Sequence, residues 1–121
     1  MTPPNALSAF QHLEWSAIPV EHVAEGITRQ LFAGDRIMVV RLELKAGTVT
    51  PIHTHHHEQV TLVMKGRVDF FVEGRKHTAE AGEVLVFPSQ IVHGATMLDQ
   101  DVVLLDIFSP PREDFLRTEK A

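Results

Sequence analysis

The side chains most able to do chemistry lie in two histidine-containing segments of the chain. Residues 47–66 read GTVTPIHTHHHEQVTLVMKG, and residues 82–97 read GEVLVFPSQIVHGATM. Imidazole nitrogens and amide oxygens are donors that bind divalent metal ions. The donors at ligand-like spacing are His53, His55, Gln59 and His93. We therefore predict one metal site that is assembled from both segments.

Such a site requires extended strands that bring these donors together. Residues two apart on a β-strand lie on the same face, about 6.5–7 Å from each other. His53 and His55 have this spacing, so both imidazoles are expected to point into one cavity. The same periodicity predicts that Gln59 lies on that face, and a second strand must then supply His93.

The run HTHHHE also has a simpler interpretation, as a solvated loop or part of a purification tag. A tag lies at a terminus without flanking strand patterns, whereas this run is internal and lies between Pro51 and an apolar strand. Of the adjacent histidines, His56 and His57, we expect at most His57 to face the cavity. The remaining histidines have no partner at ligand spacing and are predicted to be surface residues: His12, His22 and His77.

The two segments resemble the two motifs of the cupin superfamily, G-x5-H-x-H-x3-E-x6-G and G-x5-P-x-G-x2-H-x3-N. The spacing agrees at every position. Three residues differ, because Gln59 replaces the Glu of the first motif, Gln90 the Gly of the second and Met97 its Asn. The Gly position concerns turn geometry, whereas the change from a carboxylate to an amide alters the chemistry of the site.

Length and composition exclude several classes of protein. The 121 residues suffice for one domain with a core but not for two. The absence of cysteine excludes disulfides and thiolate ligands. A net charge of −5 without a basic stripe argues against a nucleic-acid partner. No apolar run is long enough to span a membrane, and the N-terminal sequence does not resemble a signal peptide, so we expect a cytoplasmic protein.

Strand-like runs dominate the chain after Gly26. They are residues 36–44, 59–64, 68–72, 84–87 and 102–108. Turn residues recur between them at the spacing typical of a sandwich or barrel. We predict an all-β, single-domain double-stranded β-helix, the jelly roll that the cupin resemblance implies. The predicted barrel covers residues 26–112, with an N-terminal arm at 1–25 and a C-terminal tail at 113–121.

The predicted donor set determines what a bound ion could do. Three imidazoles and one amide oxygen are neutral, so a divalent ion would keep its full charge and act as a strong Lewis acid. The same neutrality gives little support to a trivalent ion, which favours non-redox chemistry. We expect one divalent ion per chain, Ni, Zn, Mn or Fe, and these donors do not distinguish among them.

A second group of candidate residues lies in the segment LLDIFSPPREDFL, residues 104–116. Asp106 and Phe108 are two apart and are expected to face the same side of their strand. A carboxylate among apolar neighbours has a raised pKa and can act as an acid or a base. Arg112 follows two prolines and is suited to bind a substrate carboxylate. The alternative is structural, with Asp106 accepting backbone hydrogen bonds and Arg112 paired with a neighbouring carboxylate.

The chain from about Gly26 to Leu116 resembles the KdgF-type pectin-degradation cupins. The resemblance rests on GITRQ at residues 26–30, RIMVV at 36–40, the H-x-H-xx-E-Q run and the tail DIFSPPREDFL. It implies conversion of 4,5-unsaturated monouronates from pectin or alginate into linear keto sugars. That family carries Gln in place of the motif's Glu. Its Asp-x-Phe-x3-Arg trio corresponds to Asp106, Phe108 and Arg112, which are therefore candidate catalytic residues.

Two rival classes remain open from the sequence alone. A cupin dioxygenase would use a redox-active metal and consume oxygen. A non-catalytic metal- or sugar-binding cupin is the second, although such sensors usually carry a fused DNA-binding domain. The favoured partner is a small anionic sugar. A homodimer is also expected, in which the N-terminal segment with the apolar residues Trp15, Ile18 and Val20 packs on a partner subunit or extends the partner's sheet.

Overall fold

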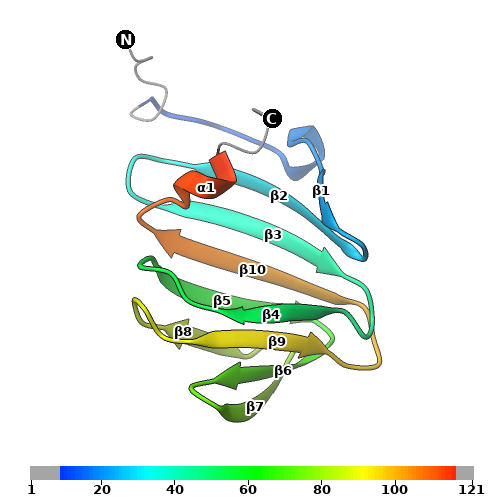
Figure 1. Cartoon of the computed structure of the whole chain (residues 1–121). Helices are drawn as coiled ribbons and strands as arrows, with labels where there is room; N and C mark the ends of the chain where they lie inside the picture. Colours follow the sequence, from blue (N-terminus) through cyan, green and yellow to red (C-terminus); the bar gives the residue numbers. More distant parts are fainter. Residues whose placement is uncertain (1–8, 117–121) are drawn as a thin grey trace.

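Two antiparallel β-sheets form nearly all the regular structure of residues 9–116, the part of the chain that this computed structural model describes (Figure 1). The first sheet has the order β1 (Glu21–Ala24), β2 (Ile27–Ala33), β3 (Met38–Leu44), β10 (Val102–Ser109), β5 (Glu58–Lys65), β8 (Val84–Phe87). The second has the order β4 (Val49–His53), β9 (His93–Met97), β6 (Arg67–Val72), β7 (Arg75–Glu80). A 3-10 turn, η2 (Trp15–Ala17), precedes the strands, and a short helix, α1 (Glu113–Leu116), follows them.

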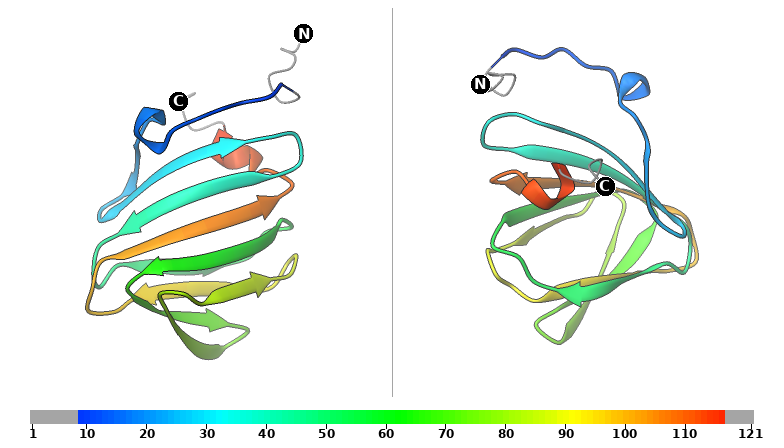
Figure 2. Two further views of the ribbon diagram at one scale, coloured as in Figure 1. Left: turned by 180° about the vertical axis from the view of Figure 1, so that it is seen from behind. Right: turned by 45° about the horizontal axis from the view of Figure 1, so that its top comes forward.

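The sheets face one another and enclose a core, which confirms the predicted all-β jelly roll (Figure 2). The central strand β10 shows the reason, since its residues alternate between inward and outward positions. Val102 and Leu104 point inward and are buried, whereas Val103 and Leu105, which alternate with them, are only partly buried. Asp106 and Phe108 continue the inward row, as the sequence predicted. This alternation places a carboxylate on the inner wall of the barrel.

The glycine that ends the first motif, Gly66, connects β5 to β6 where two backbones approach closely. Its φ of 88° lies in the left-handed region. A Cβ atom added there would lie 2.7 Å from the carbonyl oxygen of Asp101. Only glycine meets both conditions without strain, and the turn it forms leads the chain from one sheet to the other.

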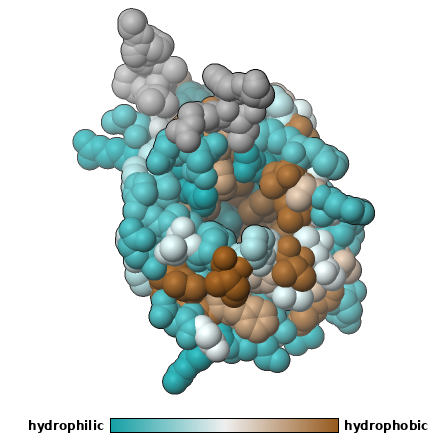
Figure 3. Space-filling model, viewed as in Figure 1, coloured by the Kyte–Doolittle hydropathy of each residue, from teal (hydrophilic) through white to brown (hydrophobic). Residues whose placement is uncertain are grey.

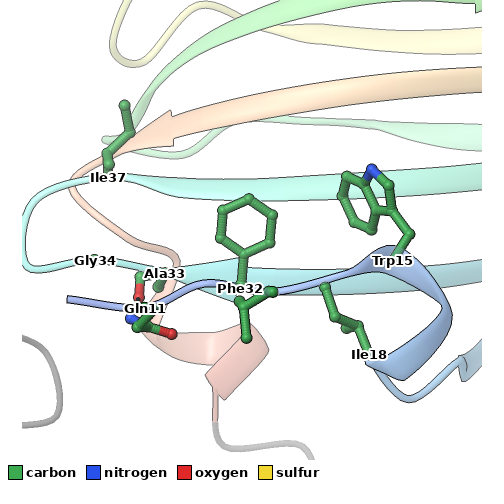
Figure 4. Close-up of a pocket in the computed structure, with 8 residues that line it drawn as sticks. Gln11, Trp15, Ile18, Phe32, Ala33, Gly34 and Ile37 are labelled. Carbon is green, nitrogen blue, oxygen red and sulfur yellow. Dashed lines mark hydrogen bonds between the residues drawn. The ribbon is translucent and has the colours of Figure 1, made fainter. Parts of the chain in front are cut away.

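From residue 9 onward, the N-terminal arm runs alongside β2, at the edge of the six-stranded sheet (Figure 2). Trp15 contacts Phe32 with ring centroids 5.6 Å apart, and the side-chain amide of Gln30 donates hydrogen bonds to the carbonyls of Trp15 and Ile18. A groove of about 460 Å³ lies between the arm, β2 and the loop that leads from β2 to β3 (Figure 4). The last residues of the predicted arm form β1, which pairs with β2 as an edge strand.

Candidate metal centre and its cavity

Three of the four predicted ligands approach one another at one end of the barrel. His53 ends β4 and pairs in register with His93, the first residue of β9. His55 follows in the loop after β4, with its ring centroid 5.1 Å from that of His93. Each of these three histidines offers a ring nitrogen within 4.8 Å of those of the other two. They form a group with the composition and size of a metal site.

The route by which these side chains meet differs from the sequence prediction in two respects. His55 lies beyond the end of β4, so its position comes from the loop and not from strand alternation. Gln59 lies on β5, in the opposite sheet, because the chain bends at His56 and His57. The prediction that strand periodicity puts Gln59 on the face of His53 and His55 is therefore wrong. Gln59 nevertheless faces the same interior and is buried.

Hydrogen bonds to backbone carbonyls fix the tautomer of all three histidines. The Nδ1 atoms of His53, His55 and His93 lie 2.8, 3.1 and 2.9 Å from the carbonyl oxygens of Pro51, His57 and Ile91. A carbonyl only accepts hydrogen bonds, so each Nδ1 must carry a proton. Each Nε2 of the neutral ring then has a lone pair, and metal-binding histidines are oriented by this kind of bond.

The amide of Gln59 is oriented by a chain of hydrogen bonds. Its Nε2 donates to Thr61 Oγ1 at 2.9 Å, and the Thr61 hydroxyl donates to Asp106 Oδ1 at 2.7 Å. This leaves Gln59 Oε1 3.2 Å from the unprotonated Nε2 of His55. Two acceptor atoms at that distance repel each other unless a cation lies between them. The contact therefore fits a metal ion shared by His55 and Gln59.

The protonation states agree with this donor set. The pKa of His55 is lowered to about 4 by burial, then by the Arg112 charge and the neighbouring His93. Burial also lowers the pKa of His93. Both rings are consequently neutral near pH 7, which leaves their lone pairs free for a metal.

A cavity of about 400 Å³ extends from these ligands along the barrel interior. Figure 3 shows a hollow in the molecular surface on this side, between hydrophilic and hydrophobic residues. Asp106 lies in its wall, and burial raises the pKa of that carboxyl to about 6, although the Thr61 hydrogen bond and the Arg112 charge oppose the shift. Its second oxygen, Oδ2, has no hydrogen-bond partner among residues 9–116 and is not sealed from solvent. This oxygen is open to the cavity.

Phe108 and Arg112 also line the cavity, but Arg112 has partners that bear on its predicted role. The Phe108 ring lies 5.8 Å from the His55 ring, and the Arg112 guanidinium lies over it at 5.1 Å. Arg112 also donates two hydrogen bonds to Asp114, from Nε to Oδ1 at 3.1 Å and from Nη2 to Oδ2 at 2.8 Å. Arg112 is therefore both a cavity residue and half of an ion pair with α1.

The histidines outside the candidate metal centre are exposed at the surface, with the exception of His57. His12, His22, His56 and His77 are exposed. His57 is buried and lies beside the cavity wall, 6.5 Å from Phe108 between ring centroids, but it bonds outward to Glu113 at 2.9 Å. This bond lowers the pKa of Glu113 to about 2. His57 thus fastens α1 to the barrel, and with His56 and Glu113 it forms a second group of potential ligands.

Sequence reasoning missed two polar residues of the cavity. Thr61 lies two residues after Gln59 on the same strand, so strand alternation could have identified it. Arg29 is buried on β2 and lines the same cavity as Asp106. In the sequence, Arg29 lies two residues from Ile27 and from Leu31, so strand alternation could have placed it on the same face as these apolar residues.

Comparison with known proteins agrees with the fold. The family described as cupin domain matches residues 40–108, which include all four predicted ligands. The chain is a cupin. Within the part of this cupin that the structure describes, no helix is long and apolar enough to cross a membrane.

Its relatives include both curated and structurally characterised proteins. The pectin degradation protein KdgF of Dickeya dadantii (strain 3937) is 32% identical over 100 residues, which cover 81% of this cupin and 91% of that protein. KdgF from a Halomonas species has a structure that superposes with a TM-score of 0.83 at 29% identity, covering 88% and 99% of the two chains. An RmlC-like cupin from Shewanella frigidimarina NCIMB 400 also gives 0.83, at 28% identity and 90% and 98% coverage.

Proposed function

We propose that this cupin is a metal-dependent enzyme of pectin or alginate breakdown that opens 4,5-unsaturated monouronates to linear keto sugars. The support for the pathway is the similarity to KdgF, a pectin degradation protein. The observation that best supports the chemistry is a single cavity lined by oriented metal donors and by a carboxylate with a free oxygen. A protein of this class would act on a small sugar, and the cavity is of suitable volume.

His53, His55, His93 and Gln59 would hold a divalent ion through three Nε2 atoms and one Oε1 atom. When bound, such an ion supplies a Lewis acid that polarises an oxygen of the substrate. Because all four donors are uncharged, none of this polarising power is reduced by a ligand carboxylate. We retain Ni, Zn, Mn and Fe as the candidate ions.

The proposed reaction is an isomerisation in which one proton leaves and one returns. The C1 hydroxyl of the sugar loses its proton, the bond between C1 and the ring oxygen breaks, and C1 becomes an aldehyde. The enol left at C5 becomes a ketone when C4 takes up a proton. Atoms and electrons balance without an oxidant, so no oxygen is consumed.

Asp106 is the residue best placed to move these protons. Its free Oδ2 faces the cavity, and a pKa of about 6 leaves it ionised at neutral pH yet able to be protonated in turn. A general base works best when its pKa is near the working pH. Phe108 would form an apolar wall, and Arg112 would add positive charge near the substrate carboxylate through the Nη1 atom that Asp114 leaves free.

The experiment uses purified protein reconstituted separately with each candidate ion and supplied with unsaturated galacturonate. The expected result is loss of the short-wavelength ultraviolet absorbance of the double bond that is conjugated to the carboxylate, with no uptake of oxygen. His55→Ala should abolish the reaction, and His77→Ala, which alters an exposed histidine, should not. Unchanged absorbance with all four ions would refute the substrate assignment, and oxygen consumption would point to a dioxygenase.

We further propose a homodimer in the cytoplasm. The arm presents apolar side chains to solvent, among them Phe10 at 92% and Val20 at 64% exposure, which a partner subunit could cover. Trp15 and Ile18 instead contact this chain's own strand β2. The Trp15 ring contacts Phe32, and the Ile18 carbonyl accepts a hydrogen bond from the Gln30 side chain. A sedimentation mass of one chain at micromolar concentration would count against the dimer.

A further inference from the structure

A second arginine, Arg29, lines the same cavity from β2, on the inner face of the six-stranded sheet. Arg29 lies on β2 and is 7% exposed. Its Nε donates to Glu21 Oε1 at 2.7 Å, and the two residues are directly opposite each other on β1 and β2. Glu21 therefore holds the guanidinium by one edge only.

The other edge of that guanidinium has no protein partner. Among residues 9–116, no hydrogen bond is made to Nη1 or Nη2 of Arg29, and neither atom is sealed from solvent. Arg112 differs, because Asp114 occupies both its Nε and its Nη2. Of the two arginines that line the cavity, Arg29 is thus the one with a complete pair of Nη groups free for bidentate contact.

An aromatic ring fixes the plane in which Arg29 can bind a ligand. The guanidinium carbon lies 4.2 Å from the centre of the Phe115 ring, and that of Arg112 lies at the same distance from this ring. Phe115 belongs to α1 at the mouth of the barrel. Stacking on a ring leaves the edge of a guanidinium available for hydrogen bonds, so Phe115 orients Arg29 without using its donors.

The sheet register shows that Arg29 and Asp106 lie on strands separated by one intervening strand, β3. Arg29 is opposite Leu42 on β3, which is opposite Leu104 on β10, and Asp106 is the next inward residue after Leu104. Neighbouring strands are about 4.8 Å apart, so β2 and β10 are separated by about 10 Å. Both side chains line the one cavity, so a single small sugar could contact the Asp106 carboxylate and the Arg29 guanidinium together.

We propose that Arg29 binds the carboxylate of the sugar substrate through Nη1 and Nη2, with Glu21 as its positioning residue. The assignment rests on the proposed function in taking a uronate as the ligand. Bidentate pairing of a guanidinium with a carboxylate is among the strongest charge-assisted hydrogen bonds. In a cavity that α1 borders through Phe115, this contact would distinguish uronates from neutral sugars of the same shape.

The test compares binding of D-galacturonate with that of D-galactose, which lacks the carboxylate, by calorimetry on the metal-loaded protein. We expect the wild type to prefer galacturonate by about ten- to a hundredfold, the value of a hydrogen-bonded charge. Arg29→Gln should remove most of this preference, with the Arg112 charge accounting for the remainder, and leave galactose binding unchanged, which also shows that the cavity is intact. Arg29→Lys should keep part of it, because the charge remains while the paired donors are lost.

The matched control is Arg41→Gln on the adjacent strand, because Arg41 also pairs with a glutamate, at 2.6 Å, but lies outside the cavity. It should bind both sugars as the wild type does. A wild type without preference for galacturonate, or an Arg29→Gln variant that retains the preference, would overturn the assignment. Because binding is measured on stable sugars, an Arg29-dependent preference in a protein that leaves unsaturated uronates unchanged would refute the proposed reaction alone.

Discussion

Replacing Thr61 with valine should raise the pKa of Asp106, because the Thr61 hydroxyl donates a hydrogen bond to that carboxylate. Thr61 is fully buried, and its hydroxyl joins the Gln59 amide to the Asp106 carboxylate. Valine has the same shape but no hydroxyl. The change therefore removes two hydrogen bonds without opening a cavity, and it leaves Asp106 without a hydrogen-bond donor among residues 9–116.

The magnitude follows from the charge on the acceptor. A hydrogen bond to an ionised group contributes about 1.5–3 kcal/mol, and 1.36 kcal/mol corresponds to one pKa unit. The Thr61 hydroxyl lowers the pKa of Asp106, against the larger effect of burial. Its removal should raise that pKa by about one to two units. Because the ionised carboxylate is the active form, the acid limb of the kcat/KM profile should move to higher pH by the same amount.

The assay is the pH dependence of kcat/KM on unsaturated galacturonate for the wild type, Thr61→Val and Thr61→Ser. Serine keeps the hydroxyl, so its acid limb should stay near that of the wild type. The valine variant should also bind metal about 10–100-fold more weakly, since the Gln59 amide is no longer held with its oxygen toward His55. A valine variant whose acid limb coincides with that of the wild type would refute the role of Asp106 as the titrating base.

Three further predictions concern stability. The raised pKa of Asp106 means that the folded state binds its proton more tightly than the unfolded chain, so wild-type stability should fall as pH rises from 3.8 to about 6. Asp106→Asn should lack that pH dependence, and in denaturant titrations at pH 7 its free energy of unfolding should exceed that of the wild type by up to about 3 kcal/mol. The variant should also lose activity. His55→Ala should eliminate metal by elemental analysis and cancel the rise in Tm that added metal gives the wild type. Gln90 has a φ of 71°, so Gln90→Gly should raise or leave unchanged the free energy of unfolding, whereas Gln90→Val should lower it.

More of the fold than of the candidate site could be predicted from the sequence. Strand alternation and turn spacing suffice for a jelly roll, and Val84–Phe87 begins and ends where the sequence predicted. The convergence of His55 and Gln59 could be expected from motif spacing but not from local geometry, because a bend between two sheets produces it. Partners from distant segments, such as Thr61 for Asp106 and Glu113 for His57, depend on tertiary packing. No local pattern encodes them.

The division of the ligands between the two sheets has a mechanical consequence. His53 and His93 belong to the four-stranded sheet, and Gln59 belongs to the six-stranded sheet. An ion held by all three would act as a cross-link between the halves of the sandwich, a role that disulfides fill in other small β-proteins. This chain has no cysteine with which to make one. Pulling the sheets apart would then require the ion to be released first, so the same atom would set both the reactivity of the cavity and the resistance of the barrel to being opened.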